Sequence, residues 1–188
     1  MLDRRLEPVT PLGADQPAIV TIGPVTITEV VDVALASLAI RRGRTGDVTS
    51  AAEALGLPLP EPGRAGTGPI WSAFWLGPEQ WMVEAPFDSH EDIVAHLRSV
   101  FGDAASITEQ TDAWVRFDLT GTDLAALLER LCVLDPARLE PGAATRTSIE
   151  HLGCAVVRRA KDVLSVMGPR SAAGSLHHAL VTAARSVF

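Results

Sequence analysis

The stretch IWSAFWLGPEQWMVEA, residues 70–85, contains two runs of apolar and aromatic side chains on either side of a Gly-Pro pair. Aromatic residues favour strands and Gly77-Pro78 favours a turn, so the stretch predicts strands over 70–76 and 80–85 joined as a hairpin. Bulky aromatic side chains occur on both faces of this hairpin, so something must cover at least one face. The stretch therefore predicts an antiparallel sheet with a covered face.

Three of the four tryptophans of the chain lie in this stretch. Because successive side chains of a strand point to opposite faces, Trp71 and Trp75 share one face and Phe74 lies on the other. Two interpretations stay open. The aromatic side chains form core, or they form a docking surface, since exposed tryptophans mark interaction sites. The candidate partner-interface residues are therefore Trp71, Trp75 and Trp81.

The segments around the hairpin also show periodic patterns. Residues 33–41 (VALASLAIR) predict a largely buried strand, and residues 47–55 predict an Ala-rich helix that ends at Gly56. After the hairpin, Ser89 is the expected N-cap of a second helix, with Asp92 three residues later in a capping-box-like arrangement. The apolar stripe of this helix consists of Ile93, Val94, Leu97 and Phe101.

The order of strand and helix then restarts. Residues 112–120 (DAWVRFDLT) alternate, which predicts a strand with two unlike faces, and Asp118 on its more polar face is expected to face solvent. Gly121 ends this strand, and Thr122 is the expected N-cap of a helix. The core stripe of that helix consists of Leu124, Leu127, Leu128 and Leu131. Short strands are predicted at 145–150, 154–159 and 163–167, followed by a final helix with Ser171 as its N-cap.

This order of elements predicts an α+β fold made of two successive split β-α-β-like halves, with antiparallel sheets and helices packed on them. Residues 1–16 contain several prolines and are expected to form a flexible arm. Residues 17–188 are expected to form a single compact unit, because a chain of 188 residues suits one domain. The two halves of this unit are expected to cover about 17–110 and 111–188.

The charge of the chain argues against two classes of partner. The formal net charge is −7, and the basic residues cluster no more densely than in residues 41–44 (RRGR). An acidic chain without a basic face is poorly suited to nucleic acid or to anionic membrane surfaces, so neither is an expected partner. No apolar run approaches the roughly 18–20 residues of a membrane helix, and residues 1–11 lack the apolar core of a signal peptide. We therefore predict a cytoplasmic protein.

The sequence offers few groups for chemistry. It contains no HExxH, CxxC or GxxxxGK[ST] pattern, and the spacing of its five histidines does not predict a metal site. Lys161 is expected in a turn, and helix capping explains Ser171. Cys132 and Cys154 lie in apolar surroundings that favour buried reduced thiols, with a disulfide as the alternative. We therefore predict no catalytic, cofactor-binding or metal-binding residue in this chain.

Four segments, in the correct order along the chain, resemble the gamma subunit of heterotetrameric sarcosine oxidase. They are residues 75–83 (WLGPEQWMV), 115–128 (VRFDLTGTDLAALL), 132–147 (with CVLD and PGAATRT) and 168–176 (GPRSAAGSL). The resemblance covers about residues 33–185. The same segments are similar to the folate-binding fold of the glycine-cleavage T-protein, which implies an α+β fold of that type.

The resemblance implies a division of labour between this chain and partner chains. The alpha and beta subunits of such a complex are expected to hold FAD, FMN, NAD and tetrahydrofolate, and the delta subunit is expected to hold zinc. The complex demethylates sarcosine oxidatively to glycine. The gamma subunit is expected to hold no cofactor, to pack against alpha and to support the assembly.

Two alternatives remain beside this interpretation. The first is a free-standing, tetrahydrofolate-binding protein similar to an aminomethyltransferase. Against it, the chain contains no tyrosine, so it lacks the Lys-Gly-Cys-Tyr-x-Gly-Gln-Glu signature of the folate-dependent relatives of the iron–sulfur type. T-proteins are also considerably longer than this chain. The second alternative is a structural or small-molecule-binding α+β module outside the family.

Overall fold

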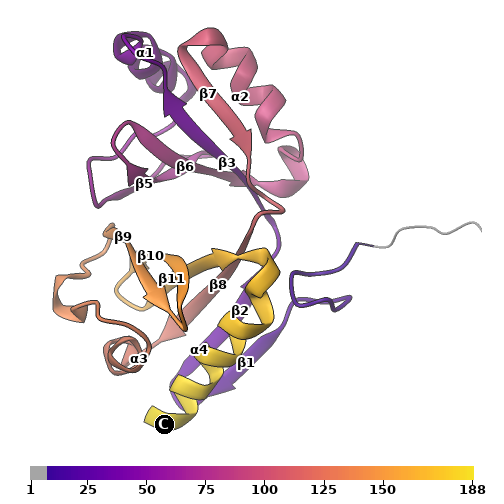
Figure 1. The fold of residues 1–188 in the computed structure, drawn as a ribbon, viewed down its shortest axis with the longest axis vertical. Helices are drawn as coiled ribbons and strands as arrows, with labels where there is room; N and C mark the ends of the chain where they lie inside the picture. Colours follow the sequence, from indigo (N-terminus) through magenta and orange to yellow (C-terminus); the bar gives the residue numbers. More distant parts are fainter. Residues whose placement is uncertain (1–7) are drawn as a thin grey trace, which may run out of the picture.

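The computed structural model describes residues 8–188, which form four layers: two helices, a five-stranded sheet, a six-stranded sheet and two further helices (Figure 1). The strands are β1 (Ile19–Ile22), β2 (Val25–Val30), β3 (Val33–Ile40), β4 (Ala65–Thr67), β5 (Ser72–Gly77), β6 (Gln80–Pro86), β7 (Ala105–Glu109), β8 (Trp114–Gly121), β9 (Ala144–Ile149), β10 (Leu152–Ala160) and β11 (Val163–Pro169). The α-helices are α1 (Thr45–Leu55), α2 (Ile93–Phe101), α3 (Leu124–Leu131) and α4 (Ala173–Val187).

All strand pairs in both sheets are antiparallel. The six-stranded sheet has the order β1-β2-β8-β11-β10-β9, and the five-stranded sheet has the order β4-β5-β6-β3-β7. The chain begins in the six-stranded sheet, crosses to the five-stranded sheet for β3 to β7, and returns for β8 to β11. This differs from the expected division into 17–110 and 111–188, because β1 and β2 belong to the same sheet as the C-terminal strands.

The pairing of β2 with β8 gives the physical reason for this difference. The register runs from Val25 opposite Gly121 to Val30 opposite Arg116. Val25 and Ile27 thereby enter the same apolar cluster as the side chains of β8 that face α3 and α4. The apolar face of β2 is thereby covered by α3 and α4, which pack on the six-stranded sheet.

The predicted α+β class, with antiparallel sheets and helices packed on them, is confirmed. In the five-stranded sheet, α1 joins β3 to β5 and α2 joins β6 to β7. In each case, the two joined strands run in the same direction with one strand between them, as in a split β-α-β unit. In the six-stranded sheet, α3 leads from β8 to the far edge, and β9, β10 and β11 return strand by strand to β8.

Three apolar clusters fill the spaces between the layers. The largest lies between the six-stranded sheet and helices α3 and α4, and it includes Phe117 and Leu176. A second lies between the five-stranded sheet and helices α1 and α2, and it includes Leu38. The smallest lies between the two sheets, and it includes Phe74 of the five-stranded sheet and Met167 of the six-stranded sheet. The space between the sheets therefore also has room for polar side chains.

Helix α2 begins later than the sequence predicts. Ser89 lies in a 3₁₀ turn, Phe87–Ser89, and not at the N-cap of the helix. The N-cap is Asp92, whose carboxylate accepts a hydrogen bond of 2.9 Å from the backbone N–H of Ala95. Because of the extra turn, the helix begins three residues later than predicted. The predicted N-cap, Ser89, is therefore wrong, and Asp92 caps the helix.

The starts of α3 and α4 also differ from the predicted caps. Asp123, in the left-handed region with φ 59°, precedes α3 in place of Thr122, and no side chain caps this end. Ser171 lies inside a 3₁₀ turn, Arg170–Ala172, that leads into α4. Among residues 8–188, none of the helices has both the length and the apolar character needed to cross a membrane.

Residues 8–16, which belong to the expected flexible arm, lie against the body of the protein. Thr10 is buried with 8% exposure, and its backbone and hydroxyl oxygens organise a turn that reaches Ala14. The remainder of the expected arm, residues 1–7, lies outside the described residues.

A buried carboxylate explains why the N-terminal segment is held. Glu29 on β2 is 2% exposed, and its two carboxylate oxygens accept hydrogen bonds from the backbone N–H groups of Leu12 (2.9 Å) and Ala18 (3.0 Å). Charge-assisted hydrogen bonds of this kind are stronger than neutral ones. Glu29 therefore holds this segment against the sheet through the backbone of Leu12 and Ala18.

Candidate functional site between the two sheets

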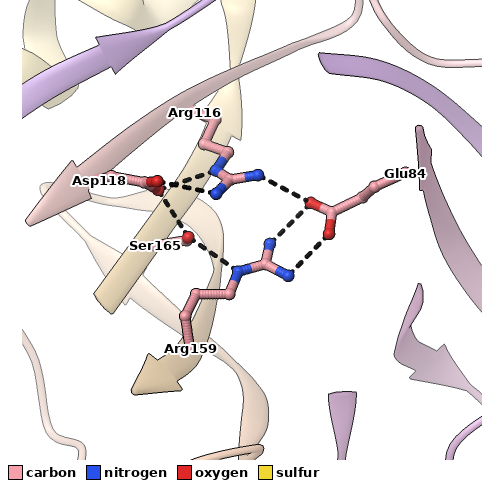
Figure 2. A network of polar contacts seen from close by, with 5 residues as sticks. All are labelled: Glu84, Arg116, Asp118, Arg159 and Ser165. Atoms are coloured by element: carbon pink, nitrogen blue, oxygen red, sulfur yellow. Dashed lines mark hydrogen bonds and ion pairs between the residues drawn. The ribbon is translucent and has the colours of Figure 1, made fainter. Parts of the chain in front are cut away.

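Five side chains form a closed polar network between the two sheets (Figure 2). Glu84 comes from β6 of the five-stranded sheet, and its side chain is only 5% exposed. The other four members come from the six-stranded sheet, namely Arg116 and Asp118 on β8, Arg159 on β10 and Ser165 on β11. The network therefore connects the two sheets through buried polar groups.

Glu84 is the acceptor for both arginines. Arg159 donates from Nη1 and Nη2 to the two carboxylate oxygens of Glu84, each at 2.7 Å, which is a bidentate pair. Arg116 donates from Nη1 to the same carboxylate at the longer distance of 3.4 Å. Bidentate guanidinium–carboxylate pairs fix orientation as well as supplying energy, so this contact holds one sheet against the other.

Asp118 completes the network on the other side. Arg116 donates to its two oxygens from Nε and Nη2, each at 2.8 Å. The hydroxyl of Ser165 donates to Asp118 at 2.6 Å and accepts a hydrogen bond from Nε of Arg159 at 3.0 Å. Asp118 therefore lies between the sheets and pairs with a guanidinium, which corrects the expectation that it faces solvent.

The charges of the network balance one another. Burial alone would raise the pKa of Asp118, but the hydrogen bonds and the positive charge of Arg116 outweigh burial and hold that pKa below its usual value. Burial alone would lower the pKa of Arg116, and its contacts with Asp118 and Glu84 outweigh burial and raise that pKa. An aspartate that stays ionised at neutral pH cannot supply a proton, so the arrangement suits a structural role better than acid catalysis.

A cavity of about 440 Å³ opens beside the network. Its walls come from residues 8–17, from the crossing between β2 and β3, and from the residues that lead into β8. The second and third of these are the places where the chain passes between the two sheets. Arg116 belongs to both the network and the cavity wall.

Arg170 stands at the same cavity. Its Nη1 lies 3.5 Å from a carboxylate oxygen of Asp112, and its Nη2 donates to the carbonyl of Val9 at 3.2 Å. Trp114 lines the cavity too, and its indole Nε1 donates to the side chain of Gln110 at 3.1 Å. The cavity therefore combines apolar walls, a fixed indole ring and guanidinium groups.

One of the three tryptophans predicted at a partner interface lies in the core. Trp71 is 2% exposed, and its ring centroid lies 4.7 Å from that of His90 and 5.2 Å from that of His96. Both histidines lie at or near α2, which covers this face of the sheet, so the indole fills the space beneath the helix. Trp71 is therefore unsuited to a docking surface.

The other two tryptophans keep part of their surface open. Trp75 on β5 lies directly opposite Trp81 on β6, and both side chains are half-buried. The indole Nε1 of Trp81 donates to the carbonyl of Pro60 at 2.9 Å. These contacts fix the pair at the turn end of the hairpin, and Trp75 and Trp81 remain candidates for contact with a partner.

The thiols and histidines form no site among the described residues. Across residues 8–188, no group of three or more His, Cys, Asp or Glu side chains could hold a metal ion. Cys132 and Cys154 are free thiols, and Cys132 is half-buried. Burial raises the pKa of Cys154 to about 11, so this thiol is protonated at neutral pH and unreactive.

Comparison with known proteins gives the fold class first. No family model matches the chain, and no curated protein matches it by sequence. Aminomethyltransferase T of the glycine cleavage system from Bartonella henselae matches with a TM-score of 0.64 at 16% identity, over 88% of this chain and 50% of that chain. The chain therefore has a fold of the T-protein type and spans about half the length of that relative.

A second solved structure matches over nearly the whole length of both chains. A chain of heterotetrameric sarcosine oxidase from Corynebacterium sp. U-96, in complex with pyrrole 2-carboxylate, superposes with a TM-score of 0.77 at 21% identity. The match covers 90% of this chain and 88% of that chain. The resemblance found in the sequence is thus confirmed at the level of the fold.

Proposed function

We propose that this chain is the non-catalytic gamma subunit of a heterotetrameric sarcosine oxidase, where it supports assembly of the complex that oxidatively demethylates sarcosine to glycine. The observation that carries the proposal is the match with a chain of such a complex, at a TM-score of 0.77 over 90% of this chain and 88% of that one. A match complete in both directions favours an equivalent subunit over a domain borrowed from a larger enzyme.

The polar network supports a structural role. The two carboxylates, Glu84 and Asp118, accept hydrogen bonds from the two guanidinium groups, and Ser165 bridges between them. The largest cluster of buried charge in the described residues therefore joins the two sheets. A rigid body of this kind suits a subunit that other chains pack against.

The partners and cofactors follow from the proposed role. The alpha subunit is the direct partner, with beta and delta in the same cytoplasmic complex. FAD, FMN, NAD, tetrahydrofolate and zinc belong to those subunits, and this chain carries no cofactor. Trp75 and Trp81 are proposed to contact the partner, because both are half-buried aromatic side chains on a rigid hairpin.

Co-expression tests the proposal. The chain is produced with the alpha, beta and delta subunits of the same organism, and the affinity tag is placed on alpha. We expect all four chains to co-elute in one complex that oxidises sarcosine, and omission of this chain to reduce the yield of intact complex. A chain that elutes alone as a monomer while alpha, beta and delta assemble without it would contradict the proposal.

A matched pair of variants tests the docking surface. Trp75→Ala combined with Trp81→Ala is expected to weaken co-elution with alpha, since interface aromatics contribute most of the binding free energy. The control, Val133→Ala, changes a side chain that is 96% exposed in the segment after α3, and it is expected to co-elute normally. Circular dichroism of both variants checks that each is folded. Equal co-elution of the two variants would remove Trp75 and Trp81 from the interface.

The cavity favours a second candidate function, a free-standing tetrahydrofolate-binding protein similar to an aminomethyltransferase. Its volume of about 440 Å³ lies within the range of small-molecule sites, about 300–1,000 Å³, and Phe87 and Trp114 supply aromatic walls. Calorimetry of the isolated chain with tetrahydrofolate decides this point. Saturable binding by the isolated chain would favour this candidate, and its absence at millimolar concentration would remove it.

A further inference from the structure

The cavity is a feature that the proposed assembly role leaves unused. It lies where the chain passes between the sheets, and the N-terminal segment, held by Glu29 through Leu12 and Ala18, forms one of its walls. The lining residues include residues of β2 and β8 in the six-stranded sheet and of β3 in the five-stranded sheet. The cavity is therefore largely formed before any ligand arrives, which favours binding because little ordering is needed.

The walls of the cavity are mainly apolar. Val30, Val33 and Leu35 come from the crossing between β2 and β3, and Phe87 and Trp114 add two aromatic rings. Nε1 of Trp114 donates a hydrogen bond of 3.1 Å to the side-chain oxygen of Gln110, and this contact holds the indole ring in the cavity wall. Apolar walls with fixed aromatic rings favour a flat, apolar body in the ligand.

The charges around the cavity are unequally buried. The side chains of Arg116 and Arg170 are 16% and 31% exposed, whereas that of Asp112 is 84% exposed. Asp15, the other carboxylate in the wall, is also exposed. The charge of Arg116 is balanced by Asp118 and Glu84, whereas the partner of Arg170 is an exposed carboxylate that water screens, so Arg170 is the charged group available to a ligand. The cavity therefore favours an anionic group over a cationic one.

Both guanidinium groups retain hydrogen-bonding capacity. All three guanidinium nitrogens of Arg116 donate to Asp118 or Glu84, one of them at 3.4 Å, which leaves two of its five N–H groups. Arg170 meets Asp112 at 3.5 Å, and an ion pair of that length with an exposed carboxylate contributes little. A ligand carboxylate that replaced Asp112 on Arg170 would therefore lose little and gain a partly buried ion pair.

We propose that this cavity binds a small aromatic monocarboxylate, with its ring against Phe87 and Trp114 and its carboxylate on Arg170 in the place of Asp112. This site is independent of the proposed function, because binding by the isolated chain requires no partner subunit.

The test uses the full chain, the anionic probe naphthoate and two matched probes that keep the ring, neutral naphthamide and cationic naphthylmethylammonium. Binding is followed by nuclear magnetic resonance through the indole N–H signal of Trp114, which Trp114→Phe identifies. We expect naphthoate to shift this signal saturably with a Kd of about 1 mM or lower. Naphthamide and the cationic probe are expected to bind at least about tenfold more weakly.

Two variants are expected to change binding in opposite directions. Arg170→Gln removes the proposed carboxylate partner and is expected to weaken naphthoate binding about tenfold, whereas Asp112→Asn removes the competing carboxylate and is expected to strengthen it about twofold. Arg138→Gln is the control, because the side chain of Arg138 is 88% exposed and lies outside the cavity wall. Naphthoate binding to this control is expected to match that to the natural chain.

Three results would overturn the proposal. One is no saturable shift of the Trp114 signal at about 10 mM naphthoate, ten times the expected Kd. Another is equal binding of naphthoate and naphthamide. A third is displacement of naphthoate by tetrahydrofolate at far lower concentration, which would assign the cavity to the folate-binding alternative. The first two results leave co-assembly with alpha untouched, so failure here and failure of the proposed function can be told apart.

Discussion

The two faces of the six-stranded sheet differ, although the same strands supply both. On the face toward α3 and α4, Phe117 of β8 lies in a largely apolar cluster and is 0% exposed. On the face toward the other sheet, the neighbouring Arg116 and Asp118 belong to an ion-paired network, and Trp114 lines a cavity. The outer face stabilises the fold by burying apolar side chains beneath α3 and α4. The inner face determines how the two sheets pack together and leaves space for the cavity.

The largest expected effect comes from breaking the network at Glu84. Glu84→Gln leaves Arg159 without its bidentate partner and Arg116 with one fewer, so we expect a loss of about 3–5 kcal/mol in the free energy of unfolding. Urea denaturation measures this loss. The control is Glu53→Gln on an exposed position of α1, where a change within about 0.5 kcal/mol is expected.

A paired replacement sharpens the same comparison. If the network mainly specifies how the sheets meet, replacing both Glu84 and Arg159 by methionine should recover much of the stability lost in Glu84→Gln, because no charge is left unpaired at that contact. A double variant that is less stable than Glu84→Gln would show that the ion pair itself supplies net stability.

A smaller effect is expected from acid. The folded-state pKa of Asp118 lies below its ordinary value of 3.8, so the unfolded chain takes up a proton first as pH falls. The stability that Asp118 contributes is therefore complete above about pH 4 and is lost as pH falls through the folded-state pKa. Denaturation at a series of pH values measures this loss. Asp118→Asn is expected to have a flatter profile below pH 4, and an unchanged slope would contradict the assignment.

The smallest effect is expected on the outer face. Ile27 on β2 is 1% exposed in the apolar cluster, so Ile27→Val should cost about 0.5–1.5 kcal/mol in the free energy of unfolding. Ile19→Val, at a position of β1 that is 67% exposed, is the matched control and should change little. Equal effects of the two substitutions would contradict the placement of β2 in the six-stranded sheet.

The local pattern of the sequence predicts the elements whose signals are contained in a short stretch. The hairpin of β5 and β6 follows from two aromatic runs around Gly77-Pro78, and it is confirmed. Gly56 is confirmed at the end of α1, where its φ of 72° is a conformation that glycine adopts without strain. The alternation in 112–120 is confirmed in β8, where every second side chain from Val115 is buried.

The first hairpin also has a signal in the local sequence. Residues 19–30 (IVTIGPVTITEV) alternate on both sides of a Gly-Pro pair, which is the pattern of a hairpin, and they form β1 and β2. Gly121 of β8 lies opposite Val25, the first residue of β2. A side chain there would come within 1.9 Å of the carbonyl oxygen of Pro24, at a φ of 133°. That contact joins residues far apart in the chain, so no local pattern reveals it.

The candidate site could not be predicted for the same reason. Glu84 and Arg159 form the bidentate pair although they are 75 residues apart in the sequence. Each lies on a strand whose pattern gives its face but not its partner on the other sheet. The sequence leaves Trp71 open between core and interface, and its packing against His90 and His96 depends on how α2 lies over the sheet. The local sequence pattern predicts which face of a strand is buried and where an element ends. The residues of the candidate site come together only when the two sheets pack against each other.

Co-purification tests the central claim most directly. The chain is co-expressed with the alpha, beta and delta subunits of its own organism, with the tag on alpha, and the mass and composition of the eluted complex are measured. The proposed role predicts a single species that contains one copy of each chain and oxidises sarcosine. Recovery of an intact, active complex from which this chain is absent, while the chain itself is folded and soluble, would contradict it.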